Sequence, residues 1–310
     1  GVCWNFASDT TGVPRGVRMN RCVANNSAGA GFRFTSTTDF AFHDLLASNC
    51  AGEGFYHSGP GAGVYMNCTS AFNQVGYKIE RYSRLGQVSF VGCLTDRNQR
   101  QGVLITDGWT GGTDVPPDAA AHTILFSGCQ FRRDGYDNVN NASVSIGIHV
   151  SGTSSTYKAA PIDIVGCQVV VERGDAPGSG LPKDDYYSPL SAIRVVNAER
   201  VSITGGFFWG ETNASVTNGS CALTLGGTNS IVEWTPQTYF ARTVSGSNPR
   251  ARERDPNVPS MVGAQTLTIA QGGTGGSTPG TARSSLGVAP STPSYVVGAA
   301  NAELTSELVL

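Results

Sequence analysis

The sequence predicts an all-β chain folded as a parallel β-helix, a solenoid in which every turn of the chain adds one strand to each of several parallel sheets. Three observations support this. A short alternating apolar phrase ending in cysteine recurs, a second apolar strand follows each copy, and no helical periodicity runs between them. Repeats of about 20 to 50 residues built from short strands and turns are typical of solenoids.

The recurring phrase is clearest at three places in the middle of the chain. These are 88–93 (VSFVGC), 124–129 (ILFSGC) and 162–167 (IDIVGC). Earlier copies are 17–22 and 64–68, a weaker copy is 45–50, and in the last copy, 201–206, a glycine takes the place of the cysteine. Apolar and variable residues mostly alternate within the phrase, which indicates a strand with one buried face.

A second strand is expected after each marker cysteine or glycine. The candidates share a small first residue and then alternate: 31–34, 54–57, 76–79, 102–105, 147–150 and 192–195. Turns rich in Asn, Ser and Gly lie between the strands. The markers are 18 to 39 residues apart, and we interpret this variation as loops inserted at corners, with 111–121 and 177–189 as two such loops.

The cysteines are expected to stack. Equivalent residues of neighbouring turns lie about 4.8 Å apart, and free cysteine is among the most buried residue types. The alternative is disulfides between neighbouring turns, but one face of a parallel ladder rarely gives the required dihedral angle. We therefore expect free thiols. No C-x-x-C pair occurs, so we predict neither a metal site nor a cofactor.

Composition limits the class of partner. The 310 residues carry a formal net charge of −2, which argues against nucleic acid, since nucleic acid binds basic surfaces. No apolar run reaches transmembrane length, which argues against membrane insertion, and we expect no signal peptide. Residues 1–6 already look like part of a solenoid turn, so we expect the N-terminal cap to be missing.

Three segments are predicted. Residues 1–240 form the β-helix, 241–262 form a linker or extended arm that is charged and contains prolines, and 263–310 form a distinct C-terminal segment that ends abruptly in an apolar stretch. A flexible Gly-rich linker is the alternative for this last segment. Its flanking apolar residues argue against that alternative: Leu267, Ile269, Leu286 and Val288.

The C-terminal segment resembles a known pattern. Gln271-Gly272-Gly273-Thr274-Gly275, with Ala282-Arg283 and Leu286-Gly287 after it, is similar to the QGGTG…AR..LG segment of tail fibres and tailspikes of tailed bacteriophages. The β-helix before it resembles, in architecture, the pectin-lyase-like helices of phage tailspikes. The fold class expected is therefore a right-handed parallel β-helix with a C-terminal trimerisation segment.

This resemblance implies a homotrimer in the virion tail, made in the bacterial cytoplasm, that recognises and degrades a host capsule, exopolysaccharide or lipopolysaccharide. The missing N-terminal part would attach to tail or baseplate proteins. Three alternatives remain: a receptor-binding fibre without enzymatic activity, a rigid structural spacer, and a free bacterial polysaccharide lyase. The C-terminal segment argues against the lyase.

Candidate glycan-binding residues lie in one outward column. Counting from the small first residue of each second strand, position two holds Arg33, Tyr56, Lys78, Leu104, His149 and Arg194. Apart from Leu104 this column is cationic or aromatic, which suits an acidic sugar chain. A solvated face or a trimer interface is the alternative.

Candidate catalytic residues follow from the same counting. Glu80 and Asp107 fall one step apart on neighbouring turns, very roughly 5 to 8 Å, within the range of paired glycosidase carboxylates. The alternative is an ion pair of Asp107 with Arg81.

His57 points inward among aliphatic residues. It is expected to be a hydrogen-bonded core residue, or else to open a site near Glu53 and Tyr56. A lyase would take its base from His, Lys or Tyr, and hydrolase and lyase remain open.

Overall fold

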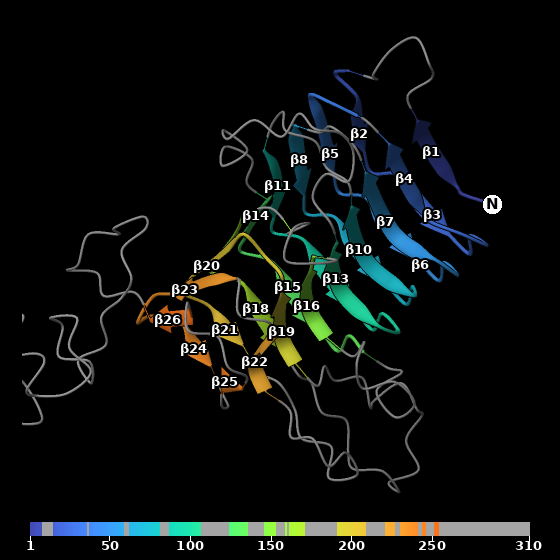
Figure 1. Cartoon of the computed structure of the whole chain (residues 1–310). Helices are drawn as coiled ribbons and strands as arrows, with labels where there is room; N and C mark the ends of the chain where they lie inside the picture. Colours follow the sequence, from blue (N-terminus) through green and yellow to red (C-terminus); the bar gives the residue numbers. More distant parts are fainter. Residues whose placement is uncertain are drawn as a thin grey trace, which may run out of the picture. The chain divides into compact units, whose positions relative to one another are not determined.

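The computed structural model describes residues 1–7, 15–35, 37–58, 62–80, 87–106, 124–135, 146–152, 159, 161–170, 191–208, 221–226, 230–240, 244–245 and 251–253. Every regular element within these ranges is a β-strand, and no helix there is long and apolar enough to cross a membrane. Figure 1 shows the strands arranged in successive layers.

Three parallel sheets make up the solenoid. The first sheet contains the longest strands: β1 (Trp4–Ala7), β4 (Phe32–Thr35), β7 (Glu53–Ser58), β10 (Val75–Glu80), β13 (Gln101–Ile105), β16 (Ile146–Ser151), β19 (Ser191–Val196), β22 (Cys221–Gly226) and β25 (Val244–Ser245).

The second sheet contains β2 (Arg18–Asn20), β5 (Phe40–His43), β8 (Gly63–Met66), β11 (Val88–Val91), β14 (Ile124–Ser127), β17 (Ile162–Val165), β20 (Arg200–Thr204), β23 (Ile231–Trp234) and β26 (Ala251–Glu253). The third contains β3 (Val23–Asn25), β6 (Leu46–Ser48), β9 (Thr69–Ala71), β12 (Leu94–Asp96), β15 (Gln130–Arg132), β18 (Gln168–Val170), β21 (Phe207–Phe208) and β24 (Tyr239–Phe240).

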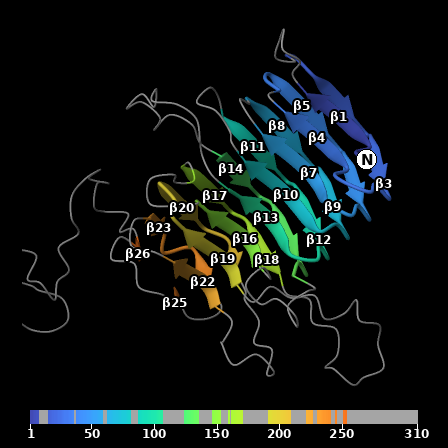
Figure 2. The same cartoon turned by 45° about the vertical axis from the view of Figure 1, so that its right-hand side comes forward.

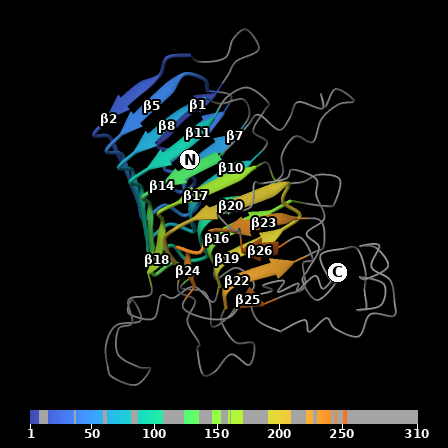
Figure 3. The same ribbon diagram turned by 90° about the vertical axis from the view of Figure 1, so that its left-hand side faces the viewer.

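The chain visits the three sheets in a fixed order, and one visit to each makes a rung. Every strand pairs in parallel with the equivalent strand of the next rung, so that β4 pairs with β7 and β7 with β10. The views in Figures 2 and 3 show the same stacking from two sides. The predicted parallel β-helix is confirmed.

The sequence predicts two strands per rung, and the structure has three. The missed strands are those of the third sheet, such as Leu94–Asp96, which are only two or three residues long. Each three-residue strand points a single side chain inward, and in the early rungs that residue is small or polar, as at Ala47, Ser70 and Thr95. A strand with one inward residue shows no alternation that could be recognised in the sequence.

The core consists of stacked columns of identical or similar side chains. Phe32, Phe55 and Tyr77 stack along the first sheet with ring centroids 5.1 and 4.8 Å apart. Tyr65, Phe90 and Phe126 stack along the second at 4.7 and 4.8 Å. Further along, the columns become aliphatic, with Ile148 and Ile193 and then Ile164 and Ile203 fully buried. The stacking distance follows directly from the spacing of hydrogen-bonded strands.

Marker cysteines form one buried inward column, as predicted. Cys68, Cys93, Cys129 and Cys167 follow one another at the corner between the second and third sheets. The first three thiols donate to second-sheet carbonyls of the preceding rung, and the Cys167 thiol donates to the carbonyl of Val165. The interaction of the protonated Cys68 thiol with Cys93, together with burial, raises the pKa of Cys68. All seven cysteines with described side chains are free thiols.

The prediction that Cys50 belongs to this column is wrong. Leu45 occupies the marker position, because the register places His43 opposite Met66, two residues before Leu45 and Cys68 respectively. Cys50 lies at the next corner, after β6. With Leu45 in place, the first markers are evenly spaced, 23 residues apart from Cys22 to Leu45 and from Leu45 to Cys68.

The residue before each marker has a left-handed backbone. This holds for the seven markers from Cys22 to Gly206, which follow Arg21, Asp44, Asn67, Gly92, Gly128, Gly166 and Gly205, with φ between 51° and 62°. The Gly-Cys pair is thus a corner in which glycine relieves the strain of positive φ and cysteine fills a small inward space.

Two predicted segments are partly or wholly beyond the described ranges. Within 241–262, β25 and β26 continue the first and second sheets by pairing with β22 and β23. The chain divides into compact units at Val258 and Pro259, and the proposed trimerisation segment, 263–310, lies outside the described residues.

Gly128→Val should destabilise the fold through backbone strain alone. A Cβ at Gly128 meets nothing within 4 Å, so no clash contributes, and a left-handed L-residue costs roughly 1–2 kcal/mol, with β-branching adding to it. Gly128→Asn is the matched control, since asparagine tolerates this conformation and Asn67 already adopts it. Urea denaturation of the two variants beside the wild type measures the difference, and equal losses would contradict the strain account.

Candidate functional site

The predicted glycan-binding residues share one outward column of the first sheet. Strand register places Arg33 beside Tyr56, Tyr56 beside Lys78, and His149 beside Arg194. Leu104 lies between Lys78 and His149. The column therefore has two polar parts, one on β4, β7 and β10 and one on β16 and β19, whose strands follow one another in Figure 1.

Tyr56 is the centre of the first part. The Arg33 guanidinium lies 5.0 Å and the Lys78 ammonium 5.3 Å from the centroid of the Tyr56 ring. These cations come from the rungs on either side, and each distance is within the range of a cation–π interaction. The Tyr56 hydroxyl donates to Glu80 Oε1 at 2.5 Å.

Lys78 joins two carboxylates. Its Nζ lies 3.0 Å from Glu80 Oε2 and 3.4 Å from Glu53 Oε1, and all three side chains are between 22% and 24% exposed. Burial acts to lower the pKa of Lys78, but its contacts with Glu80 and Glu53 outweigh this and raise it. We call Arg33, Glu53, Tyr56, Lys78 and Glu80 the Tyr56 cluster.

The Tyr56 cluster is balanced in charge, with two cations and two anions. The sequence predicted a cationic column because it considered only position two of each strand. Glu53 and Glu80 stand at other positions of β7 and β10. Glu53 begins β7, one residue before Gly54, and its backbone pairs with Val75. The long Lys78 side chain reaches back across one rung to meet it, a contact that strand counting does not reveal.

Tyr56 is held in its protonated form. Burial and the hydrogen bond to Glu80 raise the pKa of its phenol. At neutral pH the Tyr56 hydroxyl is therefore a hydrogen-bond donor, which does not favour the role of lyase base that the sequence left open.

His149 and Arg194 form the second part of the column. Burial, with a smaller effect from the neighbouring Arg194 guanidinium, lowers the pKa of His149 to about 4. The imidazole is thus neutral at pH 7. Its Nδ1 is buried and finds no hydrogen-bond partner among the described residues.

His57 points into the core, on a strand that runs unbroken from Glu53 to Ser58. Its Nδ1 lies 3.1 Å from the Tyr65 hydroxyl, and burial lowers its pKa to about 4. At 1% exposure it is a hydrogen-bonded core histidine, and β7 shows no bend that opens a site beside it.

The proposed Glu80–Asp107 pair falls partly outside the described residues. Thr106 lies beside Glu80, since its backbone N–H donates to the carbonyl of Ile79 at 3.0 Å. Asp107 and Arg81 both lie beyond the described ranges, so the carboxylate pair and its alternative ion pair stay predictions.

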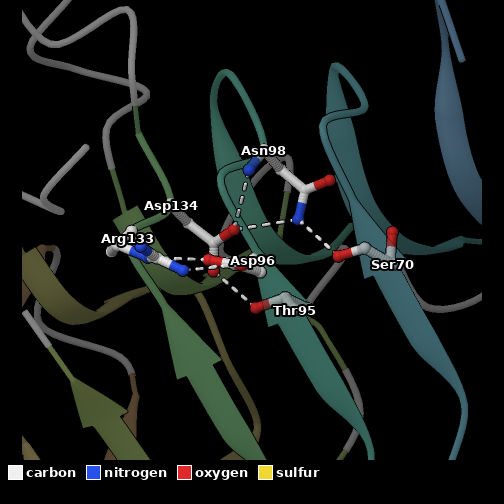
Figure 4. A network of polar contacts seen from close by, with 6 residues as sticks. All are labelled: Ser70, Thr95, Asp96, Asn98, Arg133 and Asp134. Atoms are coloured by element: carbon white, nitrogen blue, oxygen red, sulfur yellow. Dashed lines mark hydrogen bonds and ion pairs between the residues drawn. The ribbon is translucent and has the colours of Figure 1, made fainter. Parts of the chain in front are cut away.

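A second polar cluster, the corner network, lies inside the corner that follows the third sheet. Asn73 Oδ1 accepts from the backbone N–H of Cys50 at 2.8 Å, Asn98 Oδ1 from that of Asn73 at 3.0 Å, and Asp134 Oδ1 from that of Asn98 at 3.1 Å. Each side chain thus satisfies the buried backbone of the rung before it. Figure 4 shows the last of these links, with Thr95 and Ser70 completing the hydrogen bonds.

The corner network was missed in the sequence, although a signal exists. Its residues lie five places after each marker position: Ser27, Cys50, Asn73, Asn98 and Asp134. Glycines opposite make room for it. A Cβ at Gly54 would lie 2.1 Å from Ser70 Oγ, and one at Gly102 would lie 2.3 Å from Asp134 Oδ2. This is why glycine stands second in β7 and in β13.

Asp134 is the carboxyl of the corner network, and its pKa is strongly raised. Burial raises its pKa to about 7, although hydrogen bonds from Thr95 and Asn98 act to lower it. Beside it, Arg133 donates twice to the Asp96 carboxylate, at 2.9 and 2.8 Å. Asp134 is only 1% exposed, so the corner network is structural. Within the described ranges no group of His, Cys, Asp or Glu could hold a metal ion.

Comparisons with known proteins give no relative: no protein family, no curated protein and no solved structure matches this chain. The candidate site therefore rests on its own geometry. Of the two polar clusters, only the Tyr56 cluster is open to solvent.

Asp134→Asn should remove one source of pH dependence. Because the folded pKa of Asp134 is raised from 3.8 to about 7, its contribution to stability is complete below about pH 4 and is lost as pH rises through 7. The loss reaches at most about 4 kcal/mol. The variant keeps the ladder, since the new amide can donate to Thr95 Oγ1 while Oδ1 still accepts from Asn98.

The expected result is a stability difference between Asp134→Asn and wild type that grows in favour of the variant from pH 4 to pH 8. Urea denaturation across this pH range measures it. The control is Asp96→Asn, because that carboxylate is partly exposed and paired with Arg133. A pH-independent difference for Asp134→Asn would contradict the assignment.

Proposed function

We propose that this protein recognises a polysaccharide along the outward face of its first sheet. The observation that supports this is the Tyr56 cluster, in which two carboxylates, an ammonium, a guanidinium and a phenol meet on the outward side of the first sheet. Such groups can bind sugar hydroxyls, since carboxylates accept and the cations donate. Successive rungs repeat about every 4.8 Å, which gives an extended chain regular contacts.

The charge balance of the Tyr56 cluster favours hydroxyl-rich segments over strongly acidic ones. Lys78 already contacts Glu53 and Glu80, so a carboxylated sugar would compete with these side chains for the ammonium. Arg33 is the more exposed cation of the cluster and would be the place for an acidic substituent.

We propose further that the protein is a tailspike or tail fibre of a tailed bacteriophage, acting as a homotrimer on a host surface glycan. The support is the resemblance of 271–287 to tail-fibre sequences together with a parallel β-helix architecture. In this proposal the protein belongs to the virion tail and is joined to the tail or baseplate by a preceding segment.

Degradation of the bound glycan is a second candidate function. Glu53 and Glu80 both lie within 3.4 Å of the Lys78 ammonium, so two carboxylates face one exposed region, as glycoside hydrolysis requires. Glu80 with Asp107 remains the alternative pair. A binding fibre without enzymatic activity needs neither pair.

Arg33→Ala and Tyr56→Ala should each weaken glycan binding about tenfold, because each removes a contact from the column, on the scale of one to two hydrogen bonds. Titration calorimetry of the full chain with capsule, exopolysaccharide and lipopolysaccharide fractions measures this. The matched control is Arg18→Ala, an exposed outward arginine of the second sheet. If Arg18→Ala weakened binding as much as Arg33→Ala, the site would lie elsewhere.

Size-exclusion chromatography of the incubated glycan decides between binding and cleavage. If the protein is a hydrolase that uses this cluster, Glu80→Gln should slow chain shortening at least about 100-fold while leaving binding within a few fold, because it removes a charged catalytic group but keeps the shape. Glu199→Gln, an exposed glutamate directly before the second-sheet strand β20, is the control. Glycan that stays at full length with the wild-type protein would retire the catalytic role and leave a receptor-binding protein.

A further inference from the structure

The corner that follows each strand of the third sheet carries side chains that its backbone does not favour. On five successive rungs one residue there has a left-handed backbone, with φ between 52° and 57°: Asn26, Asn49, Phe72, Arg97 and Arg133. The backbone N–H groups of the first four donate to carbonyls of the following rung at 3.0 to 3.2 Å, so these residues stack on one another. Asparagine tolerates this conformation, whereas phenylalanine and arginine are strained in it.

Three successive rungs keep this strain. Glycine or asparagine would make the same turn without it, as Asn49 does at this corner and as glycine does before four of the seven markers. Backbone strain of this kind is found where side chains bind a ligand or do chemistry, because the surrounding structure has to maintain it. The side chains of Phe72, Arg97 and Arg133 therefore point to a role that the turn itself does not require.

Arg97 lies on the ring of Phe72. Its guanidinium carbon is 5.4 Å from the ring centroid, within the range of a cation–π interaction, and Phe72 is 38% exposed. Among the described residues no carboxylate forms an ion pair with Arg97. Its Nε is buried without a hydrogen-bond partner in the same part of the chain, although the side chain is partly exposed. Stacking covers one face of the guanidinium, so its terminal Nη groups remain for an acceptor in the plane.

Positive charge surrounds Arg97. Arg133, on the next rung, donates twice to the Asp96 carboxylate (Figure 4), and Arg132 stands beside Asp96 in the strand register. Three arginines thus accompany one partly exposed carboxylate, a local sum of +2 in a chain whose net charge is −2. Asp134 is the second carboxyl here, but it is 1% exposed and burial raises its pKa to about 7, so it offsets only part of this charge. We call the following residues the arginine corner: Phe72, Asp96, Arg97, Arg132 and Arg133.

We propose that the arginine corner binds a phosphate or carboxylate group, with Arg97 as its principal contact. Both groups accept in-plane pairs of hydrogen bonds from a guanidinium, which is the geometry that a ring-stacked arginine presents. Arg133, fixed by Asp96, adds positive charge from the next rung, and the exposed ring of Phe72 offers an apolar contact to the molecule that carries the anion. The site shares no residue with the Tyr56 cluster, so the proposal goes beyond the proposed function and does not depend on it.

Titration of the full chain with inorganic phosphate, glucuronate and glucose, followed by NMR of each probe, tests this. The parent chain carries Arg33→Ala, so that the Tyr56 cluster contributes no guanidinium. We expect phosphate, glucuronate or both to bind at least about fivefold more tightly than glucose. Binding of one anion alone identifies the group that the site selects, and binding of both identifies a general oxyanion site. No preference for either anion over glucose would overturn the proposal.

Arg97→Asn in this parent should weaken anion binding at least about tenfold, because it removes a charge-assisted bidentate contact. Arg21→Asn is the matched control and should leave binding unchanged, since Arg21 is an exposed arginine with a left-handed backbone, φ 55°, at the marker corner. Arg97→Lys keeps the charge but loses the planar fork, and should weaken binding at least about threefold. Equal losses for Arg97→Asn and Arg21→Asn, or full binding by Arg97→Lys, would contradict the assignment.

Urea denaturation separates binding from folding. If Arg97 is present for binding, Arg97→Asn should be at least as stable as the parent, because asparagine relieves the backbone strain, and Arg21→Asn should be so for the same reason. A urea midpoint for Arg97→Asn clearly below that of the parent, with Arg21→Asn unchanged or raised, would mean that Arg97 supports the corner through its contact with Phe72. That result would overturn the proposal.

Discussion

Parallel pairing of each strand with its equivalent in the next rung is the constraint on which the rest of this structure depends. Because the pairing is in register, every residue stands on its own counterpart about one strand spacing away. Similar side chains therefore recur at the same position of successive rungs, and the core consists of stacks such as Phe32, Phe55 and Tyr77. Features of the outer faces are columns as well, which is why binding groups accumulate along the axis rather than in a single pocket.

The corners show how the columns depend on one another. A left-handed residue turns the chain before each marker, and cysteine or leucine fills the space behind it. At the following corner, side chains such as Asn73 and Asn98 hydrogen-bond the backbone of the preceding rung. That network occupies the volume a Cβ would need at Gly54 and Gly102. The glycines thus make room for the side chains that satisfy the backbone N–H groups of Cys50, Asn73 and Asn98 at this corner.

The outward face of the first sheet carries the groups that we propose for binding. On the first sheet, Lys78 offsets the charges of Glu53 and Glu80 while Tyr56 is flanked by cations, so the surface is polar without being strongly charged. Such a polar, balanced face suits hydroxyl-rich chains, and repetition along the axis extends it over several rungs.

Sequence alone determined the solenoid, the inward cysteines and the shared column of Arg33, Tyr56 and Lys78, because alternation within a strand and repetition between rungs are local patterns. The sequence pattern placed Cys50 in the marker column, where the structure has Leu45, because loops of variable length hide the register. It did not predict the third sheet, because strands of two or three residues show no alternation of apolar and polar residues. Only the tertiary structure decided that Glu53 meets Lys78, that His57 is buried against Tyr65, and that Asn98 and Asp134 form a ladder. The Glu53–Lys78 and Asn98–Asp134 contacts join different rungs, and the His57–Tyr65 contact joins two sheets of one rung. The stacking of the rungs and the closure of each rung bring these partners together, and spacing along the chain does not reveal them.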